Sequence, residues 1–598
     1  MQVQKFENLV DMQRKAVGLH GPRPAIGTKK GGSWVWTSFN ELGRRIDAMR
    51  GGLATLGLER GDAVAIISQN RVEWAVTAYA TYGLGCRIVP MYETQLESDW
   101  LHIMADSGAK VLIVSTEAIF NQVKDWQSAE GKPLKVFCMD LSHGDEKSFA
   151  ALEAAGRENP VKAVDLEAGD VCGFIYTSGT TGKPKGVLLT HGNIISNVNA
   201  VHQMFPLERE DRSLSFLPWA HSFGQTCELH TMLSMGAAIA LAESVAKLVD
   251  NFVEVRPTIL FSVPRIFNRI YDALHKRMDE EGGIKKTLFE KALANERHRR
   301  DLAEDGRFSV AVEAQHRVFD RLVFSTIRDR FGGQLKYAFS GAAALSPEVA
   351  QFIDCLGIEV YEGYGLTETS PICTCNRPGL RKVGSIGKTI PGVRVEIDPN
   401  ALDVGNGEGE LVVHGPNVMI GYHNLPDETA AVMTDDGGFR TGDRGRVDDD
   451  GFFYITGRIK EQYKLENGKY VAPAPLEEQI QLSPFINQVF IHGENKPYNV
   501  ALIVPDRESI MSWAKKENLP GDYHTVLSDP TTRDLIRMEI ESSSKGIRGY
   551  EKIKHFALIE EEFSTDNGML TPTLKLKRRK VMERYGGMIT ELFGDDDK

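Results

Sequence analysis

The sequence predicts an α/β protein: a large N-terminal domain of α/β layers plus a β-rich subdomain, with a small, mobile α+β C-terminal domain. Helix-like and strand-like stretches alternate from about residue 34 to 170, which is typical of parallel α/β layers. Short alternating runs separated by glycines fill residues 383–457, and a compact mixed pattern restarts after Arg458. A chain of 598 residues is also too long for one hydrophobic core. We expect a large domain at 1–457, a hinge at 458–460 and a small domain at 461–598.

The first half of the chain supplies the elements of these layers. The opening residues 1–17 have the spacing of an amphipathic helix, and they lack the charged and apolar segments of a signal peptide. Residues 38–57 form a second expected helix, which a glycine ends. Further elements are expected as strands at 62–68, 87–91 and 110–115, a helix at 73–85, and a strand, a loop and an apolar helix across 214–241.

The second half begins with a helical outcrop. An insertion at about 265–332 is rich in charged residues at amphipathic helical spacing, so we expect it to be a solvated set of helices. Its three expected helices lie at 265–283, 285–306 and 315–333. A strand at 335–341 and a helix at 346–357 with a serine cap should follow.

Composition argues against several classes of protein. Hydrophobic and charged contents of 42% and 25% are ordinary for a soluble globular protein. A net charge of −12, without a basic array interleaved with aromatic residues, argues against a nucleic-acid-binding protein. Seven scattered cysteines fit reduced thiols in a cytosolic protein better than a disulfide framework. No uncharged run of about 18 residues supports a membrane span.

The stretch Tyr176–Gly186, YTSGTTGKPKG, indicates a polyphosphate-binding loop because it directly follows a strand-like apolar run. Glycines let backbone N–H groups approach phosphate oxygens, hydroxyls donate further hydrogen bonds, and lysines neutralise charge. The loop is not a Walker A motif, because Pro184 follows Lys183 where Ser or Thr is required. Its candidate ligand-binding residues are Thr177, Ser178, Gly179, Thr180, Thr181, Gly182, Lys183 and Lys185.

This loop resembles the phosphate loop of the adenylate-forming enzymes, which include acyl-CoA synthetases, luciferases and peptide-synthetase adenylation domains. The resemblance implies that the protein binds ATP and activates a carboxylate. The motif is specific for the superfamily but does not choose among its members, so the other motifs carry that choice.

The segment Tyr361–Thr369, YEGYGLTET, is similar to the second signature of the same superfamily. A carboxylate joined to ATP requires Mg²⁺ near the phosphates, and a hard cation takes carboxylate and hydroxyl oxygens. Glu368 is therefore the expected metal ligand, with Thr180 beside it, and Tyr364 offers a flat face for adenine. The remaining expected ATP-binding residues of this segment are Glu362, Gly363, Gly365 and Thr367.

A third motif joins Asp443 in FRTGD to Arg458 in YITGR. An aspartate accepts hydrogen bonds from both ribose hydroxyls, and an arginine adds a donor to ribose or phosphate. Both residues match the family pattern position by position. Lys460 falls where the family places the hinge between its two domains.

The C-terminal segment TPTLKLKRR contains the expected catalytic lysine. A lysine on a mobile loop can neutralise the charge that develops at the α-phosphate. The family lysine usually follows glycine, whereas Leu574 stands there in this chain, so Lys575 is our choice and Lys577 the alternative.

Two further positions are expected to line the acyl pocket. His221, in LPWAHSFG, matches the aromatic or histidine position at the carboxylate end of that pocket, with a structural role as the equal alternative. Gly341, Ala342 and Ala343 resemble the small-residue wall near the acyl and adenine groups, where small side chains leave room for a ligand.

From about residue 25 to 585 the chain resembles long-chain acyl-CoA synthetases. That resemblance implies that a fatty acid attacks ATP to give acyl-AMP and pyrophosphate, after which the thiol of coenzyme A displaces AMP. Rotation of the small domain would exchange Lys575 for the segment Gly468, Lys469 and Tyr470, which is expected to line the coenzyme A channel.

Alternatives within the superfamily are a ligase that loads a carrier protein and a ligase for aryl or bile-acid-like carboxylates. A nucleotide-binding regulator without chemistry is the alternative from another class. The expected partners are fatty acid, ATP with Mg²⁺, and coenzyme A, without nucleic acid. A cytoplasmic location is expected, peripheral contact with the inner face of a membrane stays open, and a dimer is weakly favoured.

Overall fold

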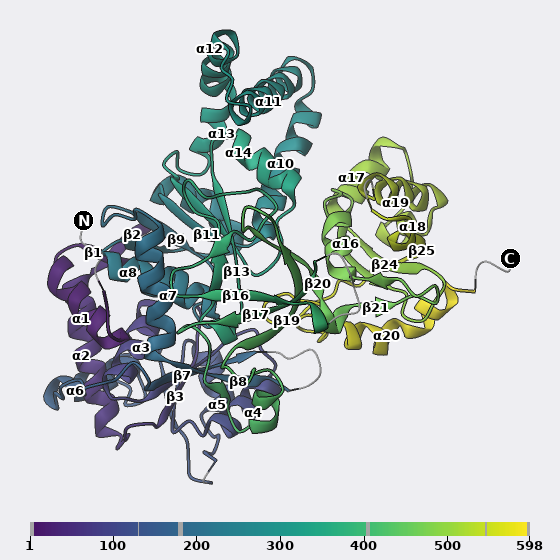
Figure 1. Cartoon of the computed structure of the whole chain (residues 1–598). Helices are drawn as coiled ribbons and strands as arrows, with labels where there is room; N and C mark the ends of the chain where they lie inside the picture. The colour runs from purple at the N-terminus through teal and green to yellow at the C-terminus, as the bar shows by residue number, and fades with distance from the viewer. Residues whose placement is uncertain (1–4, 130, 178–182, 402–406, 545–546, 595–598) are drawn as a thin grey trace.

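The computed structural model describes residues 5–129, 131–177, 183–401, 407–544 and 547–594. It confirms the α/β class, with a large N-terminal domain built on two mixed sheets and a small C-terminal α+β domain (Figure 1). Among the described helices, none combines the length and apolar character that a membrane span requires.

A nine-stranded sheet forms one half of the large domain. Six of its neighbouring strands, from β13 through β12, β11, β9 and β10 to β1, pair in parallel, and β2, β14 and β15 extend it in antiparallel fashion. In sheet order the strands are β15 (Lys388–Thr389), β14 (Ile372–Cys375), β13 (Val360–Gly365), β12 (Tyr337–Ser340), β11 (Ile259–Ser262), β9 (Arg212–Ser215), β10 (Ala238–Leu241), β1 (Pro24–Lys30) and β2 (Ser33–Ser38).

A seven-stranded sheet forms the other half and confirms the strands expected near residues 62–115. Its central strands are parallel, whereas β7 and β8 form an antiparallel hairpin whose connection is the expected phosphate loop. In sheet order the strands are β18 (Gly421–Tyr422), β8 (Lys185–Thr190), β7 (Val171–Thr177), β4 (Arg87–Met91), β3 (Ala63–Ile67), β5 (Val111–Val114) and β6 (Lys135–Cys138).

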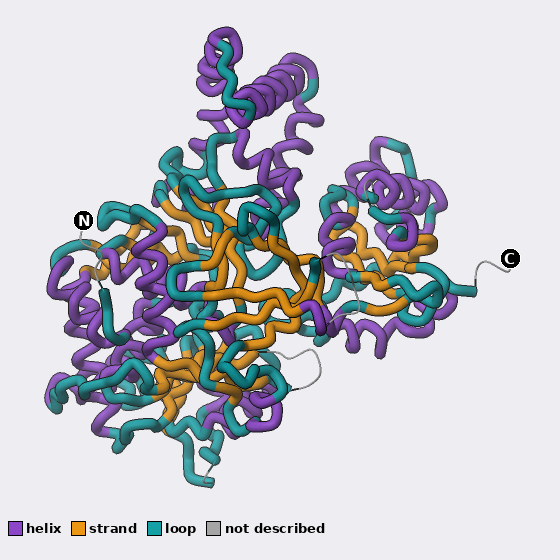
Figure 2. Tube along the Cα trace, in the orientation of Figure 1, coloured by secondary structure: helices purple, strands orange, loops and turns teal. Residues whose placement is uncertain are grey.

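The β-rich subdomain is a four-stranded antiparallel sheet. Figure 2 shows its strands lying between the large sheets and the C-terminal domain. The strands, in sheet order, are β16 (Arg394–Asp398), β17 (Gly409–His414), β19 (Phe439–Val447) and β20 (Phe453–Arg458).

The small domain pairs a three-stranded sheet with helices. Strand β24 pairs antiparallel with β23 and parallel with β25, and a two-stranded hairpin precedes them. Its elements are β21 (Tyr463–Lys464), β22 (Tyr470–Val471), α16 (Pro473–Ile480), β23 (Ile486–His492), β24 (Asn499–Pro505), α17 (Arg507–Lys516), α18 (Tyr523–Ser528), α19 (Pro530–Ser543), β25 (Ile553–Leu558) and α20 (Arg578–Glu591).

Helices of the large domain cover its sheets and form the outcrop at the top of Figure 1. They are α1 (Leu9–His20), α2 (Phe39–Thr55), α3 (Val72–Gly83), α4 (Glu97–Ser107), α5 (Glu117–Val123), α6 (Phe149–Glu158), α7 (His191–Met204), α8 (Thr231–Met235), α9 (Leu248–Val255), α10 (Pro264–Glu281), α11 (Gly283–Glu304), α12 (Val310–Phe319), α13 (Ser325–Asp329), α14 (Pro347–Cys355) and α15 (Pro426–Ala430).

Local capping chemistry shifts the start of two expected helices, and a third lacks the capping bond that was expected. Helix α1 starts at Leu9 rather than near the N-terminus, because the Asn8 side chain accepts hydrogen bonds from two N–H groups of the first turn. Ser309 caps α12, so this helix starts earlier than expected and gives way to a π-helical segment before α13. Ser346 occupies the N-cap position of α14, but no capping bond from its side chain appears among the described contacts.

The apolar helix expected within 214–241 is mostly a π-helix, Phe223–His230, followed by α8. A π-helical turn is wider than an α-turn and recurs at functional sites. Its polar side chains are buried: Glu228 Oε2 accepts a hydrogen bond from Ser215 Oγ (2.6 Å), and His230 Nδ1 lies 2.8 Å from Tyr79 Oη.

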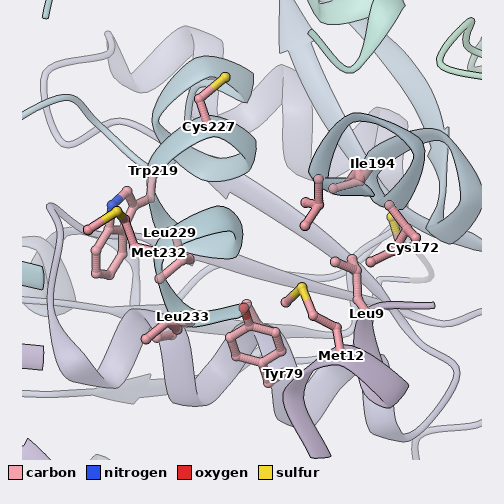
Figure 3. Close-up of a cluster of buried hydrophobic side chains, with 14 of the residues drawn as sticks. Leu9, Met12, Tyr79, Cys172, Ile194, Trp219, Cys227, Leu229, Met232 and Leu233 are labelled. Carbon is pink, nitrogen blue, oxygen red and sulfur yellow. The ribbon is translucent and has the colours of Figure 1, made fainter. Parts of the chain in front are cut away.

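One continuous apolar core joins both large sheets, and Figure 3 shows where helices from different parts of the chain meet in it. The outcrop has its own anchor, because Phe267 of α10 and Phe289 of α11 are buried in a second cluster against β11 and β12. The labelled side chains of the main core are Leu9, Met12, Tyr79, Cys172, Ile194, Trp219, Cys227, Leu229, Met232 and Leu233.

Candidate functional site

A cavity of about 1180 Å³ opens where the carboxyl ends of β7, β12 and β13 meet the β19–β20 hairpin and the segment before α20. Ligands of open α/β sheets bind at the carboxyl ends of the strands, so this is the expected place for a site. The expected residues that line it are Thr177, Lys183, Lys185, His221, Gly341, Ala342, Gly363, Tyr364, Gly365, Thr367, Glu368, Arg458, Lys460, Lys575 and Lys577.

Five expected phosphate-loop residues, Ser178, Gly179, Thr180, Thr181 and Gly182, lie outside the described residues. The flanks of the loop are held by pairing of Thr177 with Lys185 between β7 and β8. Lys185 forms an ion pair with Glu428, and burial together with the nearby Lys460 ammonium lowers the pKa of Lys185. The hairpin therefore presents cationic groups to the cavity.

Asp443 and Arg458 are direct partners across the β19–β20 hairpin. Arg458 Nε donates to Asp443 Oδ1 (2.8 Å), and Tyr364 Oη donates to Oδ2 of the same carboxylate (2.6 Å). Burial alone would lower the pKa of Arg458, but the Asp443 carboxylate outweighs it and raises that pKa. The two residues of the third motif thus form one hydrogen-bonded cluster with Tyr364.

Glu368 lies in a short helical turn, Thr367–Thr369, after β13. Its Oε1 accepts a hydrogen bond from Tyr422 Oη (2.9 Å), and its carbonyl accepts one from the N–H of Met419 (2.8 Å). The carboxylate faces the cavity and keeps further lone pairs for a ligand. Tyr422 belongs to none of the motifs in the sequence, so this partner of Glu368 could not be predicted.

A tight turn presents Lys575. The N–H of Leu574 donates to the Thr571 carbonyl (2.8 Å), and the N–H of Lys575 donates to Thr571 Oγ1 (3.0 Å). Leu574 has φ = 62°, a left-handed conformation that glycine adopts without strain. The geometry explains why glycine suits this position and shows that the turn forms without it.

The Lys575 side chain keeps accessible surface because it faces the cavity, yet protein atoms surround it closely. Burial, followed by the positive charge of Arg458, lowers its pKa below the ordinary lysine value. The carboxylates of Asp443, Glu461 and Glu368 act in the opposite direction. Lys575 is therefore electrostatically coupled to the cluster that contains Asp443 and Arg458.

His221 lines the cavity beside the π-helix, and its Nδ1 accepts a hydrogen bond from the N–H of Phe223 (3.1 Å). Burial, with a smaller contribution from the Lys575 charge, lowers its pKa to about 4. The ring is therefore neutral at pH 7, and its proton lies on Nε2 because Nδ1 is the acceptor.

Small residues, which include Gly341, Gly363 and Gly365, shape one wall of the cavity. A Cβ on Gly365 would lie 1.7 Å from the Pro371 carbonyl oxygen, so only glycine fits. Ala342 adopts φ = 72° at the same wall. Glu362 lies behind it, where its carboxylate accepts the Leu345 N–H (3.4 Å) and burial raises its pKa to about 7. Ala343 is exposed beside Ala342.

The segment Gly468–Tyr470 lies away from the cavity, in the hairpin between β21 and β22. The N–H of Leu465 donates to the Lys469 carbonyl (2.9 Å), and Lys464 Nζ lies 5.4 Å from the centroid of the Tyr470 ring. In this arrangement of the domains the cavity receives Lys575, and the Gly468–Tyr470 segment faces solvent.

An apolar arm of the cavity was not apparent from the sequence motifs. Helical spacing in 191–204 predicts a buried face, but it does not distinguish a wall of a cavity from ordinary core. The side chains that line this arm are Val201, Met204, Phe205, Leu207, Phe223, Cys227, Phe261, Phe339 and Tyr361.

These features define an α/β protein whose cavity joins a charged part, with Lys575, Arg458 and Glu368, to an apolar arm. The chain belongs to the AMP-binding enzyme family: the model of the AMP-binding enzyme matches residues 13–423, and that of the AMP-binding enzyme C-terminal domain matches residues 460–597.

Curated relatives match over nearly the whole chain. The long-chain-fatty-acid–CoA ligase FadD15 of Mycobacterium bovis is 32% identical over 573 residues, covering 94% of this chain and 93% of the relative. The long-chain-fatty-acid–CoA ligase 1 of Cavia porcellus is 30% identical over 618 residues, covering 98% and 86%. The peroxisomal long chain acyl-CoA synthetase 6 of Arabidopsis thaliana is 31% identical over 584 residues, covering 94% and 82%.

Solved structures share the fold at lower identity. The adenylation domain of a carboxylate reductase from Mycobacterium chelonae superposes with a TM-score of 0.77 at 22% identity, covering 98% of this chain and 91% of that one. The adenylation domain of a carboxylic acid reductase from Segniliparus rugosus, in complex with AMP and a co-purified carboxylic acid, gives 0.76 at 22% identity, covering 99% and 95%.

Proposed function

We propose that this protein is a long-chain fatty acid–CoA ligase, which activates a fatty acid with ATP to acyl-AMP and then transfers the acyl group to coenzyme A. The observation that carries the proposal is that Lys575, Arg458 and Glu368 line the same cavity as the apolar arm. Curated relatives that span nearly the whole chain and carry this activity in their names support it.

In the first half-reaction, the fatty carboxylate attacks the α-phosphate of ATP, the bond to the β-phosphate breaks, and pyrophosphate leaves. Asp443 accepts hydrogen bonds from the ribose hydroxyls, and Arg458 supplies a donor while it fixes the carboxylate of Asp443. Lys575 stabilises the negative charge that grows on the α-phosphate oxygens. Leu574 holds the left-handed conformation suited to the glycine that precedes the family's lysine, and Lys575 follows it into the cavity, so we assign the catalytic role to Lys575 rather than Lys577.

His221 is proposed to orient the fatty carboxylate. A neutral ring with its proton on Nε2 donates one hydrogen bond to a carboxylate oxygen and adds no positive charge that would lower the reactivity of the nucleophile. The phosphate-loop residues, with the lysines at 183 and 185, are proposed to hold the β- and γ-phosphates.

The donor set fits an Mg²⁺ ion that arrives with the nucleotide. Among the described residues, no group of three or more His, Cys, Asp and Glu side chains could hold a metal ion by itself. Mg²⁺ commonly takes one or two protein carboxylates and completes its shell with phosphates and water. Glu368 would be the carboxylate ligand, with Thr180 as the neighbouring hydroxyl, and the ion would neutralise phosphate charge.

In the second half-reaction, the sulfur of coenzyme A attacks the acyl carbonyl, AMP leaves, and the thiol proton is released. We propose that residues 458–460, with Lys460, act as a hinge, and that rotation there brings Gly468–Tyr470 to the pantetheine arm. The position of that segment outside the cavity supports two alternating arrangements, because Lys575 occupies the cavity in this one.

We also propose a cytoplasmic location. The seven cysteines are all described, buried and free, which fits a reducing compartment. Contact with the inner face of a membrane and assembly into a dimer are the remaining parts of this proposal.

Carboxylate-dependent exchange between ATP and pyrophosphate, measured across fatty and aryl acids, tests the function. We expect an optimum among long fatty acids and AMP release when coenzyme A is added. Exchange that ignores coenzyme A but responds to a carrier protein would identify a carrier-loading ligase. An optimum with aryl or bile-acid-like carboxylates would change the substrate class, and absence of exchange with every acid would favour a nucleotide-binding regulator.

A further inference from the structure

Three neighbouring parallel strands build the floor of the apolar arm. Phe261 of β11, Phe339 of β12 and Tyr361 of β13 are paired in register, so their side chains form one row across the same face of the sheet. The rings of Phe261 and Phe339 stack with centroids 5.1 Å apart, and Tyr361 follows at 6.1 Å from Phe339. The row is therefore a continuous aromatic surface.

The next row of residues, toward the part of the cavity proposed to bind the nucleotide, consists of glycines instead of aromatic residues. Gly341 and Gly363 lie two residues beyond Phe339 and Tyr361, on the same face, because side chains alternate along a strand. Two residues span roughly 7 Å of strand. The arm is therefore open where it meets the nucleotide and bordered by aromatic rings further back.

Phe205 lies across the aromatic row from the other side. It follows α7 directly, where its N–H donates to the Val201 carbonyl (3.0 Å) and its carbonyl accepts the Leu207 N–H (2.9 Å). Its ring centroid lies 4.8 Å from that of Phe339 and 5.6 Å from that of Tyr361. The Phe205 side chain is buried, and its backbone is fixed on both sides.

Behind Phe205 the protein reaches its surface. Tyr337, two residues back from Phe339 on β12, lies 6.1 Å from the Phe205 ring and is half-buried. The adjacent Lys336 forms ion pairs with Glu208 and Asp211. The buried Phe205 ring, with Leu207 beside it, thus lies between the apolar arm and a polar, solvent-facing layer.

We propose that Phe205 closes the far end of the acyl arm and sets the longest fatty acid that the enzyme activates. The assignment rests on the proposed function and names the specificity-determining residue of the same site. Because interiors are closely packed, a chain that extends past the aromatic row must displace the Phe205 ring from its cluster. A chain that stops short of the ring leaves methylene sites unfilled, each worth about fourfold in binding.

Chain-length profiles of kcat/KM for the full-length enzyme, with ATP and coenzyme A, test this assignment. For Phe205→Ala we expect the optimum to move to longer acids, with a gain of about tenfold for acids just beyond the wild-type limit. Short acids that do not reach residue 205 keep their wild-type values, which also shows that the variant is folded. For Phe205→Trp we expect the optimum to move to shorter acids.

Phe252→Ala is the matched control, because Phe252 is equally buried but packs on Phe331 in the separate core cluster of the outcrop. It should lower the melting temperature and leave the optimum in place. An unchanged optimum in both Phe205 variants, or an equal loss for every chain length, would overturn the role of Phe205 while the function stands. A wild-type enzyme that activates no fatty acid would overturn the function, and this assignment with it.

Discussion

The Asp443–Arg458 hairpin and the Lys575 turn meet in one cavity but are built in contrasting ways. Asp443 is 4% exposed and receives hydrogen bonds from Tyr364 and Arg458 on a regular antiparallel ladder within one domain. Lys575 follows Leu574, which is 54% exposed and holds a left-handed backbone conformation in the other domain. The proposed ribose-binding groups are thus preorganised, whereas the proposed catalytic lysine lies on an exposed turn of the other domain.

Removing the side chain of Lys575 should have the largest effect on activity. We expect Lys575→Ala to reduce acyl-AMP formation by about 10³-fold or more, since a preorganised charge at the reacting phosphate is lost. Conversion of preformed acyl-AMP to thioester should persist, because that step does not use this lysine. Both half-reactions are measured separately, by pyrophosphate release and by thioester formation.

Lys577→Ala is the matched control, since Lys577 also lines the cavity two residues away. Lys577→Ala should reduce the rate of acyl-AMP formation much less than Lys575→Ala does. If Lys577→Ala is the more damaging change, or if Lys575→Ala stops both half-reactions equally, the assignment of the lysine is wrong.

A substitution in the Asp443–Arg458 hairpin should raise KM for ATP rather than slow only one half-reaction. Asp443→Asn replaces the carboxylate that pairs with Arg458, so a charge-assisted hydrogen bond and a ribose acceptor are both weakened. We expect KM for ATP to rise about 10- to 100-fold, and ATP titrations of pyrophosphate exchange measure it.

Asp448→Asn is the control for the same chemical change, because Asp448 pairs with Lys382 at the far end of the hairpin (2.6 Å). It should leave KM for ATP within about twofold of wild type, since surface ion pairs contribute little. An equal rise in both variants would mean that Asp443 acts only through the stability of the hairpin.

Glu368 is also preorganised, because its carboxylate accepts a hydrogen bond from Tyr422 Oη. In Glu368→Gln the neutral amide is a poorer ligand for Mg²⁺, so the Mg²⁺ concentration for half-maximal exchange should rise about tenfold at fixed ATP. A magnesium titration measures this shift. Unchanged magnesium dependence would remove Glu368 from the proposed ligand set.

Periodicity and motifs predicted the parts of the molecule that local sequence determines. The strand-like apolar runs predicted the parallel strands β3, β4 and β5, and the apolar run before the phosphate-loop motif predicted β7. The antiparallel pairing of β7 with β8 was not predicted. Asp443 and Arg458 were predicted together at the ribose, but their direct ion pair and the hydrogen bond from Tyr364 were not, because a hairpin register and a long-range contact bring these side chains together.

The sequence did not predict the π-helix at Phe223–His230 or, beyond His221 and the small residues from Gly341 on, the apolar side chains that line the arm of the cavity. An apolar helix and a π-helix have the same composition over such a short stretch, and the buried contacts of Glu228 and His230 come from distant elements. Phe205 likewise follows a helix whose apolar face looks like ordinary core. These features arise from tertiary packing, which no local pattern encodes.

The smallest expected effect tests the strain of the lysine turn. A left-handed conformation costs a residue with a Cβ roughly 1–2 kcal/mol, whereas glycine gains about 0.5–1 kcal/mol more entropy in the unfolded chain. For Leu574→Gly the two contributions largely offset, so we expect the small domain to be stabilised by at most about 1 kcal/mol, a rise of roughly 2–4 °C in its melting temperature.

Leu574→Val should lower the melting temperature of the small domain, because a β-branched side chain tolerates this conformation least. Both variants should retain acyl-AMP formation, since the hydrogen bonds that shape the turn come from Thr571 and the backbone. A Leu574→Gly enzyme that melts at a lower temperature than Leu574→Val would show that side-chain contacts of Leu574, rather than the backbone geometry, hold the turn that presents Lys575.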